Sequence, residues 1–183
     1  SFKAKKGQTI AVIGSTGSGK STLINLIPRY YDVTKGSVKV DGVDVRDMTQ
    51  KELRDKLGYV PQKGVLFSGT IDSNIRYGKP EITDAQVKEA AEVAQATEFI
   101  DTKPEKYESP VSQGGTNVSG GQQQRLSIAR AIAKDPEIFI FDDSFSALDF
   151  KTDSQLRKAL KEYTKDATTV IVAQRISTIL GAD

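Results

Sequence analysis

Eight residues near the start of the chain, Gly14 to Ser21, are spaced as G-x-x-x-x-G-K-S/T, a pattern that suits phosphate binding. Glycines let the backbone approach a phosphate and turn its N–H groups inward. We expect Lys20 to reach the outer phosphates of a nucleotide and the Ser21 hydroxyl to ligate Mg²⁺. The candidate nucleotide-binding residues of this segment are Gly14, Ser15, Thr16, Gly17, Ser18, Gly19, Lys20, Ser21 and Thr22. The competing interpretation is a glycine-rich turn with a solvated lysine.

A second candidate site follows the apolar run Ile138–Phe141, which ends in Asp142 and Asp143. An aspartate at the end of a buried strand beside a phosphate loop can hold Mg²⁺, so Asp142 is a candidate metal ligand. The next carboxylate, Asp143, is placed to orient or deprotonate an attacking water. The alternative is a strand that ends in a solvated turn.

Composition limits the chemistry of the chain. It has 183 residues, 26 basic and 24 acidic side chains, no cysteine and no histidine. Disulfides, thiol nucleophiles, cysteine-based metal sites, histidine ligands and Ser-His-Asp triads are therefore excluded within it. Catalysis would rest on carboxylates, lysine, hydroxyls, amides and backbone groups. The near-neutral charge argues against a nucleic-acid partner, and no apolar stretch approaches the length of a membrane span.

Strand-like and helix-like runs alternate along the chain, which predicts an α/β fold with a mainly parallel sheet. Short runs rich in β-branched residues or phenylalanine predict strands at Thr9–Ile13, Ile138–Phe141 and Thr169–Ala173. Because these runs do not alternate with polar residues, we expect both of their faces to be buried.

Apolar spacing predicts helices around 87–94 and 156–163, and another that follows the phosphate loop through Ile27. Four residue pairs match the capping box that starts a helix, namely Thr49 with Glu52, Thr83 with Gln86, Ser119 with Gln122 and Thr152 with Gln155. The segment 64–114 is expected to be a mainly helical lobe inserted between two halves that contain strands.

Three further segments resemble motifs of ATP-binding cassette (ABC) proteins. Asn117–Arg125, with the sequence NVSGGQQQR, resembles the signature motif. Tyr59–Gln62 resembles the Q-loop and Ser146–Asp149 the D-loop, and all motifs follow in the family's order. The segments 65–71 and 74–78 resemble the region after the Q-loop in ABC exporters, which in that family lies near the transmembrane coupling helices.

The resemblance implies a P-loop NTPase (RecA-like) core at 1–63 and 115–183 with an ABC-type helical subdomain at 64–114. It implies a single nucleotide-binding domain, truncated at both ends, whose adenine-stacking residue would lie before Ser1. ATP and Mg²⁺ are the implied cofactors, and Gln62 would join Ser21 and Asp142 near the metal. The residues expected to complete a partner's site in trans are Ser119, Gly120, Gly121, Gln122 and Asp149. For Ser119 and Gln122 an ordinary capping box is the alternative.

The implied partners are a second cassette, packed head to tail, and the coupling helices of a transmembrane domain. The implied location is the cytoplasmic face of the inner membrane, as part of a transporter that exports drug-like or lipid-like substrates.

Two positions depart from the family pattern at the catalytic centre. The residue after the metal-binding aspartate is normally glutamate, and here it is Asp143; the switch histidine is replaced by Gln174. A carboxylate about 1 Å out of place can already cost a factor of about 100 in rate, and an amide cannot take a proton. The pair therefore resembles the degenerate-site subunit of heterodimeric multidrug exporters, with Asp143 and Gln174 as weakened catalytic residues. Gln113 and Gly115 also replace charged residues of an exporter motif.

Three alternatives remain. The protein could be a homodimer in which Asp143 works through a compensating water. It could be a nucleotide-gated regulatory or assembly module without useful hydrolysis. It could also be a soluble ABC ATPase that acts on DNA or the ribosome, against which the exporter-like segment 66–78 argues.

Overall fold

The structure is a computed structural model that describes residues 1–174. Its elements, in chain order, are β1 (Thr9–Ile13), α1 (Lys20–Ile24), β2 (Lys39–Val40), β3 (Val43–Asp44), the 3₁₀ turn η1 (Val45–Asp47), α2 (Gln50–Asp55), β4 (Leu57–Val60), β5 (Gly69–Thr70), α3 (Ile71–Ile75), α4 (Asp84–Val93), α5 (Thr97–Asp101), η2 (Lys106–Glu108), β6 (Pro110–Val111), η3 (Gln113–Gly115), α6 (Gly120–Ala133), β7 (Ile138–Asp142), α7 (Phe150–Tyr163) and β8 (Thr168–Ala173). The chain divides into two compact units, one of residues 1–59, 136–143 and 166 onward, the other of 60–135 and 144–165.

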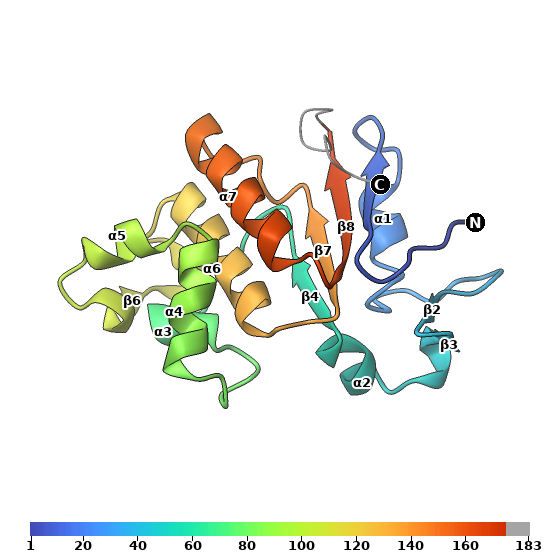
Figure 1. Cartoon of the computed structure of the whole chain (residues 1–183), viewed down its shortest axis with the longest axis horizontal. Helices are drawn as coiled ribbons and strands as arrows, with labels where there is room; N and C mark the ends of the chain where they lie inside the picture. The colour runs from blue at the N-terminus through green and yellow to red at the C-terminus, as the bar shows by residue number, and fades with distance from the viewer. Residues whose placement is uncertain (175–183) are drawn as a thin grey trace. The chain divides into compact units, whose positions relative to one another are not determined.

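The first unit is built on a four-stranded sheet in the order β1-β8-β7-β4 (Figure 1). β1 and β7 both run parallel to β8, with Ile13 opposite Ala173 and Asp142 opposite Val172. All three strands predicted from the apolar runs are confirmed, and β7 and β8 are each one residue longer than expected. The predicted α/β fold with a parallel sheet is thereby confirmed. The expected burial of both faces is wrong for β1, whose residues are partly buried and whose Ile13 is exposed.

The fourth strand, β4, was not predicted from the sequence. Its four residues are interrupted by Gly58, and glycine is a poor strand former. Leu57 and Val60 are nevertheless buried, because the strand lies beside β7 in the sheet. Here the neighbouring strand, and not the local sequence, determines the secondary structure.

Helix α1 packs on the sheet through Ile24, which is buried in a cluster with Ile140, Val170 and Val172. Burial of side chains of this size contributes about 1.5–3 kcal/mol each. The loop between β1 and α1 is therefore held at both ends by the core of the first unit.

Helix α1 is shorter than predicted. The α-helix ends at Ile24, and tighter bonds follow, from Leu26 N to Leu23 O and from Ile27 N to Ile24 O. The residue before a proline is disfavoured in helical geometry, so Pro28 prevents the helix from continuing through Ile27. The apolar spacing was correct, because Ile27 still packs on the buried cluster.

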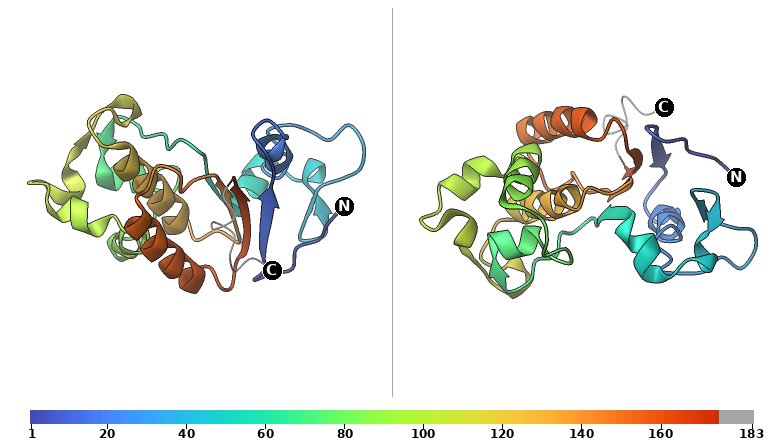
Figure 2. Two further views of the ribbon diagram at one scale, coloured as in Figure 1. Left: turned by 90° about the horizontal axis from the view of Figure 1, so that it is seen from above. Right: turned by 60° about the horizontal axis from the view of Figure 1, so that its bottom comes forward.

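The second unit is mainly helical. Its central helix, α6, packs against α3 and α4, and α4 also contacts α7 (Figure 2). The apolar side chains of Leu126, Ala129 and Ala133 on α6 are buried. The short strands β5 and β6 pair antiparallel beside these helices, so the segment 64–114 is not purely helical. Its delimitation as a separate subdomain stays a prediction.

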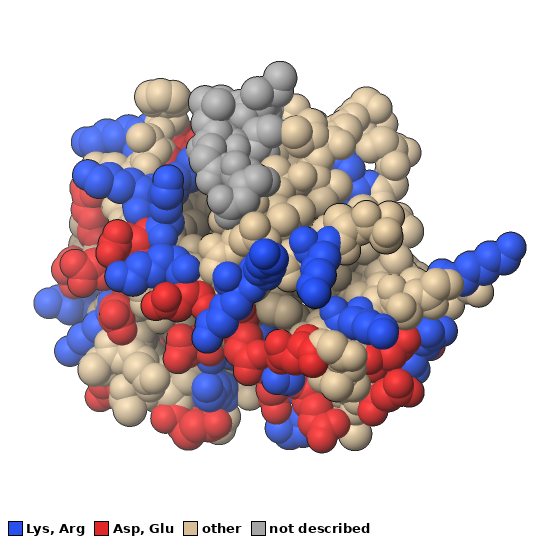
Figure 3. All heavy atoms as spheres, turned by 45° about the vertical axis from the view of Figure 1, so that its right-hand side comes forward, with Lys and Arg blue, Asp and Glu red and all other residues tan. Residues whose placement is uncertain are grey.

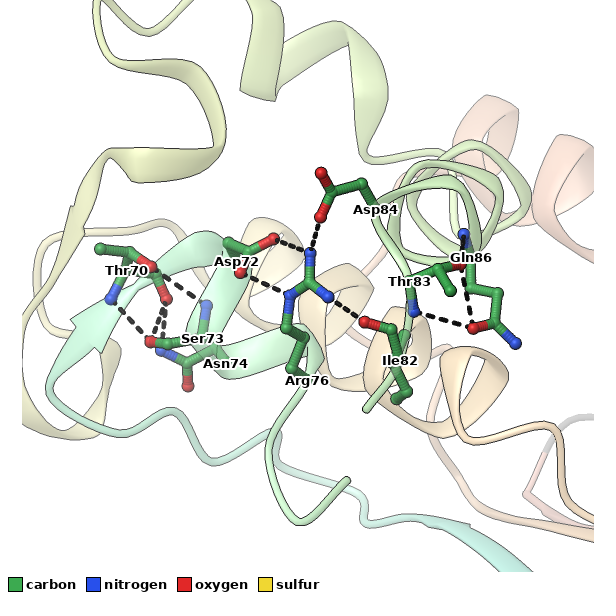
Figure 4. A network of polar contacts seen from close by, with 9 residues as sticks. All are labelled: Thr70, Asp72, Ser73, Asn74, Arg76, Ile82, Thr83, Asp84 and Gln86. Carbon is green, nitrogen blue, oxygen red and sulfur yellow. Dashed lines mark hydrogen bonds and ion pairs between the residues drawn. The ribbon is translucent and has the colours of Figure 1, made fainter. Parts of the chain in front are cut away.

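A network of polar contacts joins α3 to the start of α4 (Figure 4). Arg76 donates from Nε to Asp72 one turn earlier, at 2.7 Å, and its other nitrogens reach Asp84 and the carbonyl of Ile82. The planar guanidinium suits several acceptors at once. This network determines how the chain passes from one helix to the next.

Three of the four predicted capping boxes are confirmed: those at Thr49, Thr83 and Ser119. The fourth is wrong. Helix α7 is capped by Asp149, whose side chain accepts from Thr152 N at 2.9 Å. An ionised carboxylate at an N-cap forms a stronger hydrogen bond than a hydroxyl does, so the helix begins three residues earlier than expected.

Basic and acidic side chains are mixed on the face of the molecule shown in Figure 3. That face carries no single-sign basic patch of the kind that nucleic-acid interfaces use. The absence of a nucleic-acid partner stays a prediction.

Candidate nucleotide-binding site

The phosphate loop runs from the end of β1 to the start of α1. Gly17 and Gly19 have φ angles of 79° and 88°, in the left-handed region that side chains disfavour. At Gly14 a Cβ would lie 2.5 Å from Ser18 Oγ, too close for any other residue without a shift. The backbone conformation therefore favours glycine at positions 17 and 19, whereas at Gly14 the conflict is with the side chain of Ser18.

Lys20 folds back over this loop. Its Nζ donates to the carbonyl oxygens of Gly14 at 2.8 Å and Ser15 at 2.7 Å, and lies 3.4 Å from Ser18 Oγ. Residues 15–19 are exposed. The loop therefore presents its backbone to solvent with a cation beside it, which is the arrangement that an incoming anion needs.

The carboxyl ends of three adjacent strands meet beside the loop. β1 leads into Gly14, β7 ends at Asp142, and β8 lies between them. Ser21 Oγ, at the start of α1, donates to Asp142 Oδ1 at 3.0 Å. The structure thus brings together two of the three residues predicted to lie near Mg²⁺; their roles as ligands stay predictions.

Two further side chains reach this carboxylate region. Tyr59 Oη, from β4, lies 3.4 Å from Asp142 Oδ2 and 3.1 Å from Asn25 Oδ1. Neither residue was predicted as part of the site. Asn25 could have been found from its position four residues after Ser21, on the same helix face. The role of Tyr59 depends on β4, which was itself missed.

Burial and the Asp142 carboxylate both raise the pKa of the Tyr59 hydroxyl. The cause is that a phenolate would be poorly solvated there and would lie beside a like charge. Tyr59 therefore stays protonated at neutral pH and can act as a hydrogen-bond donor.

The two predicted catalytic residues also lie at this edge of the sheet. Asp143 follows Asp142 with a φ of 48°, a conformation that aspartate tolerates better than most residues. Its N–H donates to Val172 O at 2.9 Å, and its side chain is half-buried. Gln174 directly follows β8 and is exposed. Strand pairing thus places both residues on adjacent strand ends, and their catalytic roles stay predictions.

The donors at this edge fit Mg²⁺. Magnesium prefers oxygen ligands and usually takes one or two from the protein, with the rest from phosphates and water. The Ser21 hydroxyl and the buried Asp142 carboxylate are such a pair. Within residues 1–174 no group of three or more acidic, histidine or cysteine side chains could hold a metal ion.

The third predicted metal-site residue, Gln62, belongs to the second unit and is exposed. It follows β4 by two residues, and its role stays a prediction.

The signature segment forms the first turn of α6 in the second unit. Ser119 Oγ accepts from Gln122 N at 3.1 Å, and Gln122 Oε1 accepts from Ser119 N at 3.3 Å. The capping-box interpretation is therefore correct for this structure, and it leaves a function in trans open. A Cβ on Gly121 would lie 3.4 Å from the carbonyl oxygen of Ala147, so the turn packs closely on the segment that precedes Asp149.

Arg125 supports this turn and was not predicted to do so. Its Nε donates to Gly121 O at 3.2 Å, Nη1 donates to Gln95 O at 2.8 Å, and the guanidinium lies 4.7 Å from the ring centre of Phe99. Burial lowers the pKa of Arg125, and the nearby Asp149 partly offsets this effect. One side chain therefore links the signature turn, the α4–α5 connection and the charge at the start of α7.

Within the described part of the chain, none of the helices has both the length and the apolar character of a membrane span.

A glycine loop between a parallel strand and a helix, with a lysine over the loop and a serine–aspartate pair beside it, defines the class of P-loop nucleotide-binding proteins. The family model described as ABC transporter matches residues 1–146. The chain belongs to the ABC transporter family.

Curated relatives agree with this assignment. A protein of Staphylococcus aureus (strain NCTC 8325 / PS 47), named as a multidrug export ATP-binding/permease protein, is 49% identical over 98% of this chain and 31% of its own length. A protein of Bacillus subtilis (strain 168) with the same description is 48% identical over 100% of this chain and 32% of its own length. The chain therefore spans about a third of the length of these relatives.

A solved structure, titled as a bacterial Atm1-family ABC exporter with ATP bound, matches with a TM-score of 0.95 and 39% identity. The match covers 100% of this chain and 32% of that one. The predicted P-loop NTPase fold of ABC type is confirmed by this similarity.

Proposed function

We propose that this chain is the ATP-binding cassette of an ABC exporter. The observation that carries the proposal is the contact of 3.0 Å between Ser21 and Asp142 beside the phosphate loop, in a chain whose relatives are named as multidrug export proteins. Mg·ATP would bind to Gly14–Thr22 with Gln62 and Asp142.

Each residue of the loop has a distinct task in this proposal. Backbone N–H groups of Gly17–Lys20 surround the phosphates, and Lys20 moves from the loop carbonyls to the outer phosphate oxygens. Ser21 and Asp142 hold the metal, whose charge offsets that of the phosphates. Two such cassettes would pack head to tail, so that Ser119–Gln122 and Asp149 complete the partner's site.

We further propose that this site is degenerate. Asp143 presents a shorter carboxylate than glutamate would, and Gln174 can donate to a phosphate but cannot take a proton. Both changes weaken hydrolysis, and neither touches the loop or the Ser21–Asp142 pair. Such a site would hold its ATP, while a second, non-identical cassette hydrolyses a different ATP at its own site with the help of this chain's signature turn.

The names of the relatives support a membrane context. We propose that the cassette lies on the cytoplasmic face of the cell membrane, contacts the coupling helices of a transmembrane domain and powers export of drug-like or lipid-like compounds. ATP binding would close the cassette dimer and shift the membrane domain between its two access states.

A second candidate function rests on the same two positions. If Asp143 and Gln174 leave no useful hydrolysis, the cassette would act as a nucleotide-gated regulatory module. Turnover at this site, measured with the partner's catalytic glutamate removed, separates this function from that of a slow ATPase.

The test compares steady-state ATP hydrolysis by the native complex with that of Asp143→Glu combined with Gln174→His. With the partner's catalytic glutamate removed in both proteins, so that only this site is measured, we expect the rate to rise at least about 10-fold, since a carboxylate misplaced by about 1 Å costs a factor of about 100. The matched control is Asp135→Glu, an exposed aspartate with a similar φ of 52°, which should leave the rate unchanged.

A homodimer whose wild-type form already hydrolyses ATP at ordinary transporter rates would reject the degenerate site. Absence of ATP binding by the wild-type protein, with Lys20→Ala as reference, would reject the cassette function itself.

A further inference from the structure

The Tyr59 hydroxyl lies where three elements of the first unit meet. It comes from β4 and contacts Asn25, directly after α1, and Asp142, at the end of β7. Asp142 uses its other oxygen, Oδ1, to accept from Ser21. The two oxygens of the predicted metal-binding carboxylate therefore have different neighbours: Oδ1 contacts the aliphatic hydroxyl of Ser21, and Oδ2 contacts the phenol of Tyr59.

Hydrogen counting assigns the direction of these bonds. The Tyr59 hydroxyl has one hydrogen, so it can donate a hydrogen bond to Asp142 or to the amide oxygen of Asn25, but not to both. A carboxylate is the stronger acceptor, and the amide of Asn25 can turn to present its NH₂ group instead. With the amide turned in this way, Asn25 donates to Tyr59, Tyr59 donates to Asp142 Oδ2, and Ser21 donates to Oδ1.

The Tyr59 ring is held in place independently of its hydroxyl. It packs against the buried cluster that includes Ile24 and Ile140. The ring of Tyr30 meets it edge-on, with centres 5.7 Å apart and an interplanar angle of 77°. The guanidinium of Arg54 lies 5.3 Å from the Tyr30 ring centre. The hydroxyl is therefore presented to Asp142 from a fixed position.

We propose that Tyr59 is a positioning residue for the Mg²⁺ site: its hydroxyl occupies Asp142 Oδ2 and thereby directs Oδ1 toward Ser21 and the metal. This inference rests on the proposed binding of Mg·ATP. Partners of metal-binding carboxylates commonly contribute 10- to 100-fold to metal affinity.

Tyr59→Phe tests the proposal, because it removes one hydroxyl and keeps the ring. ATP affinity is measured twice, with saturating Mg²⁺ and with EDTA, and the difference is the gain in affinity due to Mg²⁺. A titration then gives the Mg²⁺ concentration at which half of this gain is reached. We expect this concentration to rise about 10-fold, while ATP affinity in EDTA changes less than about twofold. Tyr30→Phe, which removes a hydroxyl from the neighbouring, half-exposed ring, should leave both values unchanged.

An unchanged Mg²⁺ requirement in Tyr59→Phe overturns the proposal. So does an equal loss of ATP affinity with and without Mg²⁺, since that pattern indicates a merely structural effect. Lack of any Mg²⁺-dependent ATP binding in the wild type would instead reject the proposed function, and the positioning role with it.

A double-mutant cycle with Asp142→Asn gives a second test. It remains informative if the substitutions also lower the stability of the protein, because it compares the effect of Tyr59→Phe in two backgrounds. If Tyr59 acts through Asp142, then Tyr59→Phe should change the Mg²⁺ requirement of the Asp142→Asn protein less than twofold. Additive effects of the two substitutions would show that Tyr59 acts elsewhere and would overturn the proposal.

Discussion

A single hydrogen bond between Ser21 and Asp142 joins residues that are 121 positions apart in the chain. It connects the helix that follows the phosphate loop to the end of a buried strand. At the scale of residues, the site therefore depends on single hydrogen bonds between side chains of different helices and strands. Buried hydroxyls elsewhere in the protein also depend on a partner from another part of the chain.

Two buried serines of the second unit should respond oppositely to the same substitution. Ser144 Oγ donates to Val60 O at 2.7 Å, whereas Ser127 Oγ has no hydrogen-bond partner among the described residues. Ser144→Ala should lower the free energy of unfolding by about 1–3 kcal/mol, because it leaves a buried carbonyl unpaired. Ser127→Ala should leave it unchanged or raise it by up to about 1 kcal/mol. Denaturant unfolding of both variants checks this; a larger loss for Ser127→Ala would contradict it.

Asp44 provides a pH-dependent prediction. Hydrogen bonds from the side chain and backbone of Arg46 lower the pKa of Asp44 from 3.8 to about 2. A carboxyl whose pKa is lower in the folded than in the unfolded state stabilises the protein at pH values above its unfolded-state pKa. This stabilisation is lost as the pH falls through the folded-state pKa. The stability advantage of wild type over Asp44→Asn should thus be present above about pH 4 and vanish toward pH 2. An NMR titration of the Asp44 carboxyl with a midpoint near 4 would contradict this.

At the scale of elements, α6 is the helix on which the second unit is organised. Arg130 on this helix donates to the backbone oxygens of Asn74 at 2.8 Å and Val65 at 2.9 Å. Its guanidinium also lies over the rings of Phe67 and Tyr77, which stack on each other. Burial lowers the pKa of Arg130 to about 10. The segment after the Q-loop is therefore held to α6 by one cation.

Arg130→Lys should be strongly destabilising, because an ammonium cannot reproduce the planar set of donors or the stacking. We expect the free energy of unfolding to fall by on the order of 2 kcal/mol. Arg157→Lys is the matched control. Arg157 lies over Phe145 and pairs with Asp153 one turn away, and a lysine can keep that pair. Equal losses in the two variants by denaturant unfolding would contradict the special role of Arg130.

The start of α7 distinguishes the observed cap from the predicted one. The bonds from Thr152 to the Asp149 carboxylate lower the pKa of Asp149, as expected for an ionised N-cap. Asp149→Ala should lower the melting temperature by about 2–4 °C. Gln155→Ala should leave it unchanged, because Gln155 is exposed and does not cap the helix. A lower melting temperature for Gln155→Ala together with an unchanged one for Asp149→Ala would instead support the capping box at Thr152.

At the scale of the whole molecule, nucleotide binding should couple to folding, because the loop and the Ser21–Asp142 pair exist only in the folded chain. At 100 times its Kd, Mg·ATP should raise the free energy of unfolding by about 2.7 kcal/mol. Lys20→Ala should lose most of this gain, and EDTA should reduce it. A wild-type melting temperature that does not respond to Mg·ATP would contradict both the linkage and the proposed function.

Features that depend on near neighbours along the chain could be predicted before the fold was known. The phosphate loop could be identified because its glycines and lysine act within eight residues. Three strands could be predicted because their apolar runs are continuous. The caps at Thr49, Thr83 and Ser119 followed from bonds that span three residues. The absence of histidine and cysteine also follows directly from composition.

Features that depend on distant parts of the chain could be recognised only in the folded protein. β4 is a strand because β7 lies beside it, and Tyr59 reaches Asp142 only because of that pairing. Arg125 and Arg130 could have been solvated helix residues, and packing made them half-buried supports of neighbouring segments. The physical reason is that local hydrogen bonds are encoded by spacing along the chain, whereas the neighbours of a buried side chain are determined by the order of strands and the packing of helices.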